Sequence, residues 1–218
     1  MKTTRHMTSR RTFVAGAAAF AAGALLPLPA AARWGVVHEL SGEATINGFR
    51  LVPASAIRAG STIATGAEGR VWFTLGGDAY FLRPRSRLRL EPSGLGEEVV
   101  NALRLLSGAV GATFRGGAGR SLRTSSVTIG VRGTGVYIET SPQETYACTC
   151  FGAAELRSVA TEGTLEHLAP RGAPHLARRI LHDPQTGTRI AAASLERHTN
   201  EEMARLERIA GRPNPFNS

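Results

Sequence analysis

Apolar and polar residues alternate with a period of two along much of the chain between residues 34 and 156. The alternation is clearest at residues 71–75, 87–91, 127–131 and 136–138. Successive side chains of a β-strand point to opposite faces, so this pattern predicts half-buried strands. Gly-rich turn signals separate the runs, among them Asn47-Gly48 and Gly76-Gly77-Asp78. The sequence therefore predicts an all-β fold over residues 33–158, a sandwich or roll of many short strands.

The pattern changes in the C-terminal extension, residues 159–218. A hairpin is predicted around residues 183–187, where Pro and Gly favour a turn. One α-helix is predicted at about residues 200–210, because Thr199 and Glu202 have the spacing of a capping box. Its apolar residues form one stripe: Met203, Leu206 and Ile209. We expect this stripe to dock on the β-domain.

The first 32 residues have the layout of a secretory signal. Basic residues, including the pair Arg10 and Arg11, precede an Ala-rich apolar run at residues 13–28, and no acidic residue occurs before Glu39. The pair resembles a twin-arginine (Tat) signal, and we expect cleavage after Ala32. An uncleaved anchor is the alternative, but the run is shorter than the roughly 20 apolar residues of a spanning helix. The sequence predicts a periplasmic or secreted protein that meets the membrane only during export.

The charge of the chain is partly a property of this segment. Without its four basic residues, the formal net charge falls from +9 to +5. Arginine dominates, Lys2 is the only lysine, and an exported protein does not meet nucleic acid, so we do not expect a nucleic-acid partner. Nucleophile-elbow, zinc-protease and phosphate-loop motifs are also absent from the sequence. We therefore expect a protein that is not an enzyme.

The β-segment resembles the FecR domain. The run Val-Arg-Gly-Thr-Gly-Val at residues 131–136 carries much of the resemblance. Scattered Gly, Asn, Leu and Ile positions add to it, among them Gly42, Asn47, Gly48, Gly60, Leu88, Leu105, Gly108 and Gly152. The resemblance implies a structural turn between two strands, formed by Arg132, Gly133, Thr134 and Gly135. Glycine there permits backbone angles that other residues resist.

The chain also departs from the best-known FecR-domain proteins, which span the inner membrane and control a sigma factor through a cytoplasmic segment. Only about a dozen residues precede the apolar run here, so we do not transfer that regulatory role. We expect instead an exported binding or interaction module. Its partner would be an envelope protein or a glycan.

Cys148 and Cys150 are the only cysteines of the chain. Residues two apart on a strand point to one face, so both sulfurs should face the same way. Their Cα atoms would lie about 6.6 Å apart, near the upper limit for a disulfide. By the family pattern, Ala147 and Thr149 face the core. The cysteines and Tyr146 should therefore face away from it, under the C-terminal extension.

The extension carries four histidines: His167, His175, His182 and His198. Two thiolates with one or two imidazoles suit Zn²⁺, or copper where soft ligands dominate. His198 and either His167 or His175 are the candidates to test first. Three alternatives stay open for the cysteines: a metal site, a strained redox-active disulfide, or two buried inert thiols.

Overall fold

A computed structural model of the chain describes residues 34–94, 100–116, 119–159, 165–169, 174–183 and 187–217. These residues form fourteen strands and one helix, which confirms the all-β prediction. The predicted signal at residues 1–32, with Arg10, Arg11 and Ala32, lies outside the described residues. The strands are β1 (Val36–Ser41), β2 (Ala44–Ile46), β3 (Phe49–Arg50), β4 (Thr62–Thr65), β5 (Arg70–Leu75), β6 (Asp78–Leu82), β7 (Arg87–Pro92), β8 (Val100–Thr113), β9 (Arg120–Arg123), β10 (Val127–Thr140), β11 (Glu144–Ser158), β12 (Leu165–Leu168), β13 (Leu176–Asp183) and β14 (Gly187–Ala193).

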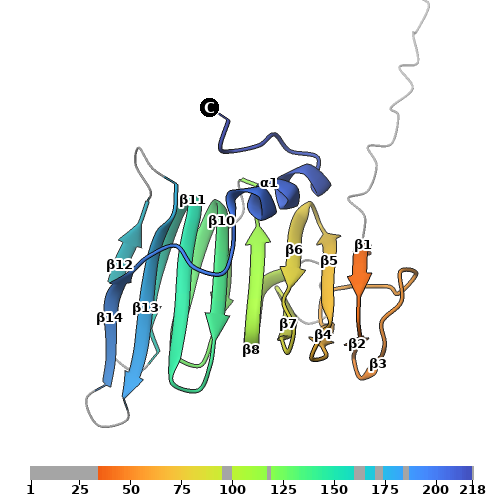
Figure 1. Cartoon of the computed structure of the whole chain (residues 1–218), viewed down its shortest axis with the longest axis horizontal. Helices are drawn as coiled ribbons and strands as arrows, with labels where there is room; N and C mark the ends of the chain where they lie inside the picture. Colours follow the sequence, from red (N-terminus) through yellow and green to blue (C-terminus); the bar gives the residue numbers. More distant parts are fainter. Residues whose placement is uncertain are drawn as a thin grey trace, which may run out of the picture.

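The strands form two layers that share three long strands (Figure 1). One layer runs β1-β5-β6-β8-β10-β11-β13-β14, and the other runs β3-β2-β4-β7-β8-β9-β10-β11-β12. Eleven of the fourteen strands are short, as predicted, whereas strands β8, β10 and β11 contain 14, 14 and 15 residues. Each of them pairs with one layer along its first half and with the other layer along its second half.

A glycine with positive φ lies where each long strand changes layer. These are Gly108 in β8, Gly133 in β10 and Gly152 in β11, with φ of 74°, 58° and 77°. L-residues with a side chain rarely adopt such angles, so glycine allows each strand to bend without breaking its pairing. The sequence periodicity is disrupted at these bends, which is why each long strand reads as two short ones.

The Val-Arg-Gly-Thr-Gly-Val run is therefore a bulge inside β10, and the prediction of a turn between two strands was wrong. The register of β10 against β11 shifts between Arg132 and Gly135. Thr134 is fully buried; its Oγ1 accepts from Ala153 N and lies 2.6 Å from the Ala153 carbonyl. Gly135 is required for space, since a Cβ there would lie 2.2 Å from the Phe151 ring. The Thr134 hydroxyl also lies 2.8 Å from the Arg132 carbonyl, while the Arg132 side chain is exposed.

The main hydrophobic core lies between the layers and includes Phe73, Tyr80, Leu88, Leu105 and Ile129. A second apolar cluster lies on the outer face of the first layer, and helix α1 (Asn200–Ile209) covers it (Figure 1). The predicted capping box of Thr199 and Glu202 is present. Met203 and Leu206 of α1 are both 0% exposed. The stripe thus docks on the β-domain as predicted.

Ion pairs join the C-terminal residues to the strands around the second cluster. Arg83 contacts Glu202 at 2.7 Å, and Arg205 pairs with Glu39. The predicted hairpin is also confirmed, because β13 pairs with β14 from Ala177 to Asp183. The predicted domain boundary after residue 158 falls at the end of β11, and β12, β13 and β14 continue the two layers.

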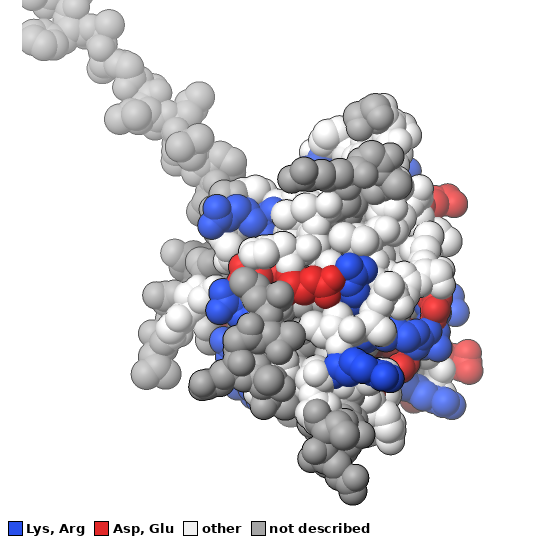
Figure 2. Space-filling view, turned by 90° about the vertical axis from the view of Figure 1, so that its left-hand side faces the viewer, with Lys and Arg blue, Asp and Glu red and all other residues white. Residues whose placement is uncertain are grey.

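Charged side chains of both signs are interspersed over the end of the molecule that carries β12, β13 and β14 (Figure 2). Several of them are paired across strands. Arg178 contacts Glu166 at 2.6 Å, and Arg179 contacts Glu144 at 2.7 Å. This end therefore presents no field of a single sign. Among the described residues, no helix has the length and apolar character needed to span a bilayer.

Candidate metal centre

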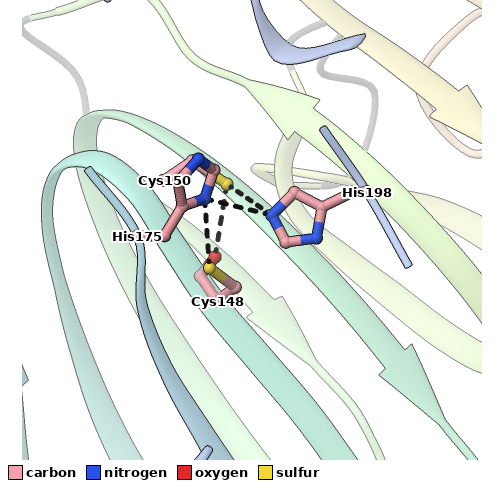
Figure 3. A group of neighbouring side chains, drawn as sticks. All are labelled: Cys148, Cys150, His175 and His198. Carbon is pink, nitrogen blue, oxygen red and sulfur yellow. Dashed lines mark hydrogen bonds between the residues drawn. The ribbon is translucent and has the colours of Figure 1, made fainter. Parts of the chain in front are cut away.

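Four potential metal ligands from three segments meet beneath the C-terminal residues (Figure 3). Cys148 and Cys150 come from β11, His175 directly precedes β13, and His198 lies two residues before α1. Their ligand atoms all lie within 4.8 Å of one another. Cys148, Cys150 and His198 are 1%, 0% and 4% exposed, whereas His175 is half-buried. The cluster is therefore nearly closed to solvent.

Strand geometry places the first three of these ligands. The two cysteines share the outer face of β11 with Tyr146, while Ala147 belongs to the main core, as predicted. In the register of β11 with β13, Thr149 lies opposite Leu176. His175 therefore lies beside Cys150, whose carbonyl accepts a hydrogen bond from the His175 backbone N–H at 3.2 Å. Pairing of the strands thus brings His175 to the cysteines.

Side-chain packing places the fourth ligand. The His198 imidazole stacks on the Tyr137 ring, with centroids 4.5 Å apart and planes 15° apart. Thr199 follows immediately and caps α1, which fixes the direction of the chain at His198. The docking of α1 on the second cluster therefore also determines where His198 lies.

Three of the six separations between donor atoms are close to those of a tetrahedral zinc site, and all six are within 4.8 Å. Zn–N bonds of about 2.0–2.1 Å and Zn–S bonds of about 2.3 Å imply N···N near 3.4 Å and N···S near 3.6 Å, roughly. The His175 Nδ1 and His198 Nε2 atoms lie 3.2 Å apart. Cys148 Sγ lies 3.6 Å from His175 Nδ1, and Cys150 Sγ lies 3.3 Å from His198 Nε2. These four residues could hold a metal ion with little movement.

Each imidazole is oriented by a hydrogen bond on its outer nitrogen. His198 Nδ1 lies 2.8 Å from the Glu196 carbonyl, and His175 Nε2 contacts Asn200 Oδ1. Both partners are oxygen acceptors, so the outer nitrogens carry the protons. The inner nitrogens then direct lone pairs at each other across 3.2 Å. Two facing lone pairs repel unless a cation, either a proton or a metal ion, lies between them.

The thiols respond differently to these surroundings. Hydrogen bonding, first from Cys150 and then from His175 and His198, outweighs burial and lowers the pKa of Cys148 to about 4. Burial, together with the adjacent Cys148, raises the pKa of Cys150 well above its usual value. Burial alone would lower the pKa of His175, but hydrogen bonds with Cys148 and Asn200 raise it. The cluster thus favours a thiolate at Cys148, the form in which cysteine binds metal.

Only some of the histidines predicted as ligands lie in the cluster. His175 and His198 join the cysteines, as their selection for a first test anticipated. His167 lies on β12 opposite Glu155 and is not part of the cluster, so of the two alternatives the structure favours His175. The side chain of His182 lies outside the described residues. Asn200 was not predicted, because as the first residue of a helix it has no sequence signal of its own.

No family model matches the chain, and no curated protein matches it. Two crystal structures of a "putative anti-sigma factor" from Parabacteroides distasonis ATCC 8503, at 1.65 and 2.50 Å resolution, are similar to it at 14% identity and a TM-score of 0.49. The similarity covers 67% of this chain, which spans only 64% of the length of those solved chains. The FecR-domain assignment stays a prediction from the sequence.

Proposed function

We propose that this chain is an exported metal-binding protein whose centre is formed by Cys148, Cys150, His175 and His198. The observation that carries the proposal is the orientation of the two imidazoles. Both have their outer nitrogen committed to an oxygen acceptor and their inner nitrogen directed at the buried sulfurs. Metal-binding histidines are characteristically held in this way by an outer acceptor.

The donor set favours Zn²⁺, with Cu⁺ as the second candidate. Two thiolates and two imidazoles in a near-tetrahedral arrangement are typical of structural zinc sites. Soft sulfur ligands also suit Cu⁺. Four protein ligands leave no coordination position for a substrate, which supports a structural or sensing role rather than catalysis.

A bound ion would fasten the C-terminal residues to the β-domain. It would connect β11 to the start of β13 through His175 and to the segment before α1 through His198. We call residues 194–217, which carry His198 and α1, the strap. The metal would hold the strap over the second apolar cluster, where Met203 and Leu206 are buried.

The contacts of the cysteines argue against two alternatives, inert buried thiols and a permanent disulfide. Inert buried thiols would need no imidazole partners, yet each sulfur contacts a histidine nitrogen. A permanent disulfide would leave both inner nitrogens facing each other without a thiolate. The interaction module for an envelope protein or glycan stays a prediction, and the export signal supports a periplasmic location for the metal centre.

Metal content of the full chain, purified from the periplasm and reconstituted under reducing conditions, tests the proposal. We expect one zinc or copper ion per chain by elemental analysis. Replacement by Co²⁺ should give the absorption of a tetrahedral, thiolate-bound ion. The Cys148→Ser, Cys150→Ser double variant and His198→Ala should lose the metal, whereas His167→Ala, the matched control on β12, should retain it. A wild-type chain that takes up no metal, or equal loss in His167→Ala, would contradict the proposal.

A further inference from the structure

We infer that the centre is a reversible, oxidation-sensitive clamp. A peroxide oxidises Cys148 and Cys150 to a disulfide, and the metal is then released and the strap loosens. This inference rests on the proposed metal-binding function and adds the regulation of the same site. Its starting point is the arrangement of the two sulfurs. Both project from the outer face of one strand, separated by a single residue, with their ligand atoms inside the same 4.8 Å cluster.

A disulfide between these residues requires no movement of whole elements. Across one residue of extended strand the Cα atoms lie about 6.6 Å apart, within the range that disulfides span. The value is near the upper limit of that range, so the bond would be strained and readily reduced. A thiol reductant should therefore restore the two thiols. The oxidation would act as a switch rather than as damage.

The exposure of the two histidine ligands indicates which sulfur an oxidant reaches first. Cys150 lies beside the buried His198, whereas Cys148 lies 3.6 Å from Nδ1 of His175, the half-buried ligand. Phe216 stacks on the His175 ring at 5.8 Å between centroids. A small oxidant such as hydrogen peroxide that passes this edge meets Cys148 before Cys150.

The chemistry balances with hydrogen peroxide as the oxidant. The Cys148 sulfur attacks one peroxide oxygen, the O–O bond breaks, and the departing hydroxide takes a proton to become water; Cys148 is now a sulfenic acid. The Cys150 sulfur then attacks the Cys148 sulfur, the S–O bond breaks, and a second hydroxide leaves as water. In sum, a zinc dithiolate, one peroxide and two protons give one disulfide, one free Zn²⁺ and two waters. Two electrons pass from the sulfurs to the peroxide.

Loss of the thiolates removes the metal, since Zn²⁺ binds the thiolate form of cysteine. The strap then loses its connection to β11, which the metal bound by His198 would provide. It keeps the packing of Met203 and Leu206 and the exposed ion pairs, of which Arg205 with Glu39 is one. Exposed ion pairs of that kind contribute little to stability. Oxidation should therefore increase opening of the strap and exposure of the apolar cluster beneath it.

The test uses the zinc-loaded full chain, with zinc content measured before any oxidant is added. Stepwise hydrogen peroxide should release one zinc ion per disulfide formed, as read by a chromophoric zinc chelator, by the loss of two hydrogen atoms in intact mass, and by loss of both titratable thiols. A thiol reductant should reverse all three changes. Cleavage within residues 194–199 by a protease should become at least about tenfold faster in the oxidised chain, the effect of about 1.4 kcal/mol in strap opening.

Two variants separate the steps. Cys150→Ser should stop at the Cys148 sulfenic acid, trapped by dimedone, without an internal disulfide. His167→Ala should respond like the wild type. Zinc that stays bound with both thiols intact under peroxide would overturn the inference while leaving the metal function in place, as would zinc release by oxidation beyond the sulfenic acid without a disulfide. A chain that binds neither zinc nor copper before oxidation would overturn the proposed function and this inference with it.

Discussion

Asn200 offers the sharpest test of the metal centre, because its side chain acts on the metal only through His175. Asn200 Oδ1 accepts the hydrogen bond from His175 Nε2 and so fixes the tautomer that directs Nδ1 at the cysteines. Asn200→Ala removes that acceptor. Loss of such an outer-shell partner typically weakens metal binding about 10- to 100-fold. This range corresponds to about 1.4–2.8 kcal/mol of binding free energy.

The same substitution should change the stability of the metal-free fold only slightly. Asn200 is the first residue of α1, and the capping box is formed by Thr199 and Glu202, which remain. Alanine has a higher helix propensity than asparagine, by at most about 0.7 kcal/mol. Loss of the exposed hydrogen bond to His175 costs about 0.5–1.5 kcal/mol, and the gain in helix propensity offsets part of this cost, so the free energy of unfolding of the metal-free chain should fall by no more than about 1 kcal/mol. The expected result is a split between metal affinity and intrinsic stability.

The assay measures both quantities on the same preparations. Zinc affinity comes from competition with a chelator of known affinity, and stability from urea unfolding with excess chelator. Asn200→Asp keeps an oxygen acceptor for His175 and should restore zinc affinity to near the wild-type value. The reasoning fails if Asn200→Ala binds zinc as the wild type does, or if the Ala and Asp variants are weakened equally, since the side chain would then not act as an acceptor.

Three further substitutions test the packing of α1 and of the bulge in β10. Leu206→Ala should cost about 2–5 kcal/mol of the docking of α1 because the side chain is fully buried, and faster proteolysis of the strap in the metal-free chain would show it; wild-type cleavage rates would contradict it. Thr134→Val leaves the Ala153 N–H and carbonyl without their hydroxyl partner, which should lower the free energy of unfolding in urea by about 1–3 kcal/mol, and an unchanged value would refute that role. Gly135→Ala places a Cβ 2.2 Å from the Phe151 ring and should lower the free energy of unfolding in urea by about 1–3 kcal/mol. The loss should be smaller when Phe151 is also replaced by alanine; an equal loss in the two backgrounds would show that the ring is not the obstacle.

Local sequence signals predicted the parts of the fold that are determined locally. The alternation at residues 71–75 and 87–91 corresponds to strands β5 and β7, and the capping box marked the start of α1 within a residue. The same period of two placed both cysteines on one face, away from the main core. Such features depend on neighbours a few residues away, so a single sequence contains them.

Features set by contacts between distant segments were not predictable in the same way. The bends at Gly133 and Gly152 divide long strands into runs that read as separate short ones. His167 and His175 lie in the same extension, and only the register of β12 and β13 against β11 decides which of them reaches Cys148. Composition and spacing do not contain that register. The contact of Asn200 with His175 was also not predictable, since it depends on the docked position of α1.

The metal would be the strongest of the strap's polar contacts with the β-domain. Without an ion, the strap depends on the burial of Met203 and Leu206 and on ion pairs such as Arg83 with Glu202, whose side chains are 24% and 23% exposed. Partly exposed pairs of this kind contribute about 0–1 kcal/mol each, whereas structural zinc in small peptides contributes roughly 10–16 kcal/mol in apparent binding free energy. Even a fraction of that zinc contribution exceeds the other strap contacts that reach the solvent. Metal occupancy should therefore add to the burial of Met203 and Leu206 in keeping the outer apolar cluster of Trp72, Phe81 and Tyr137 covered.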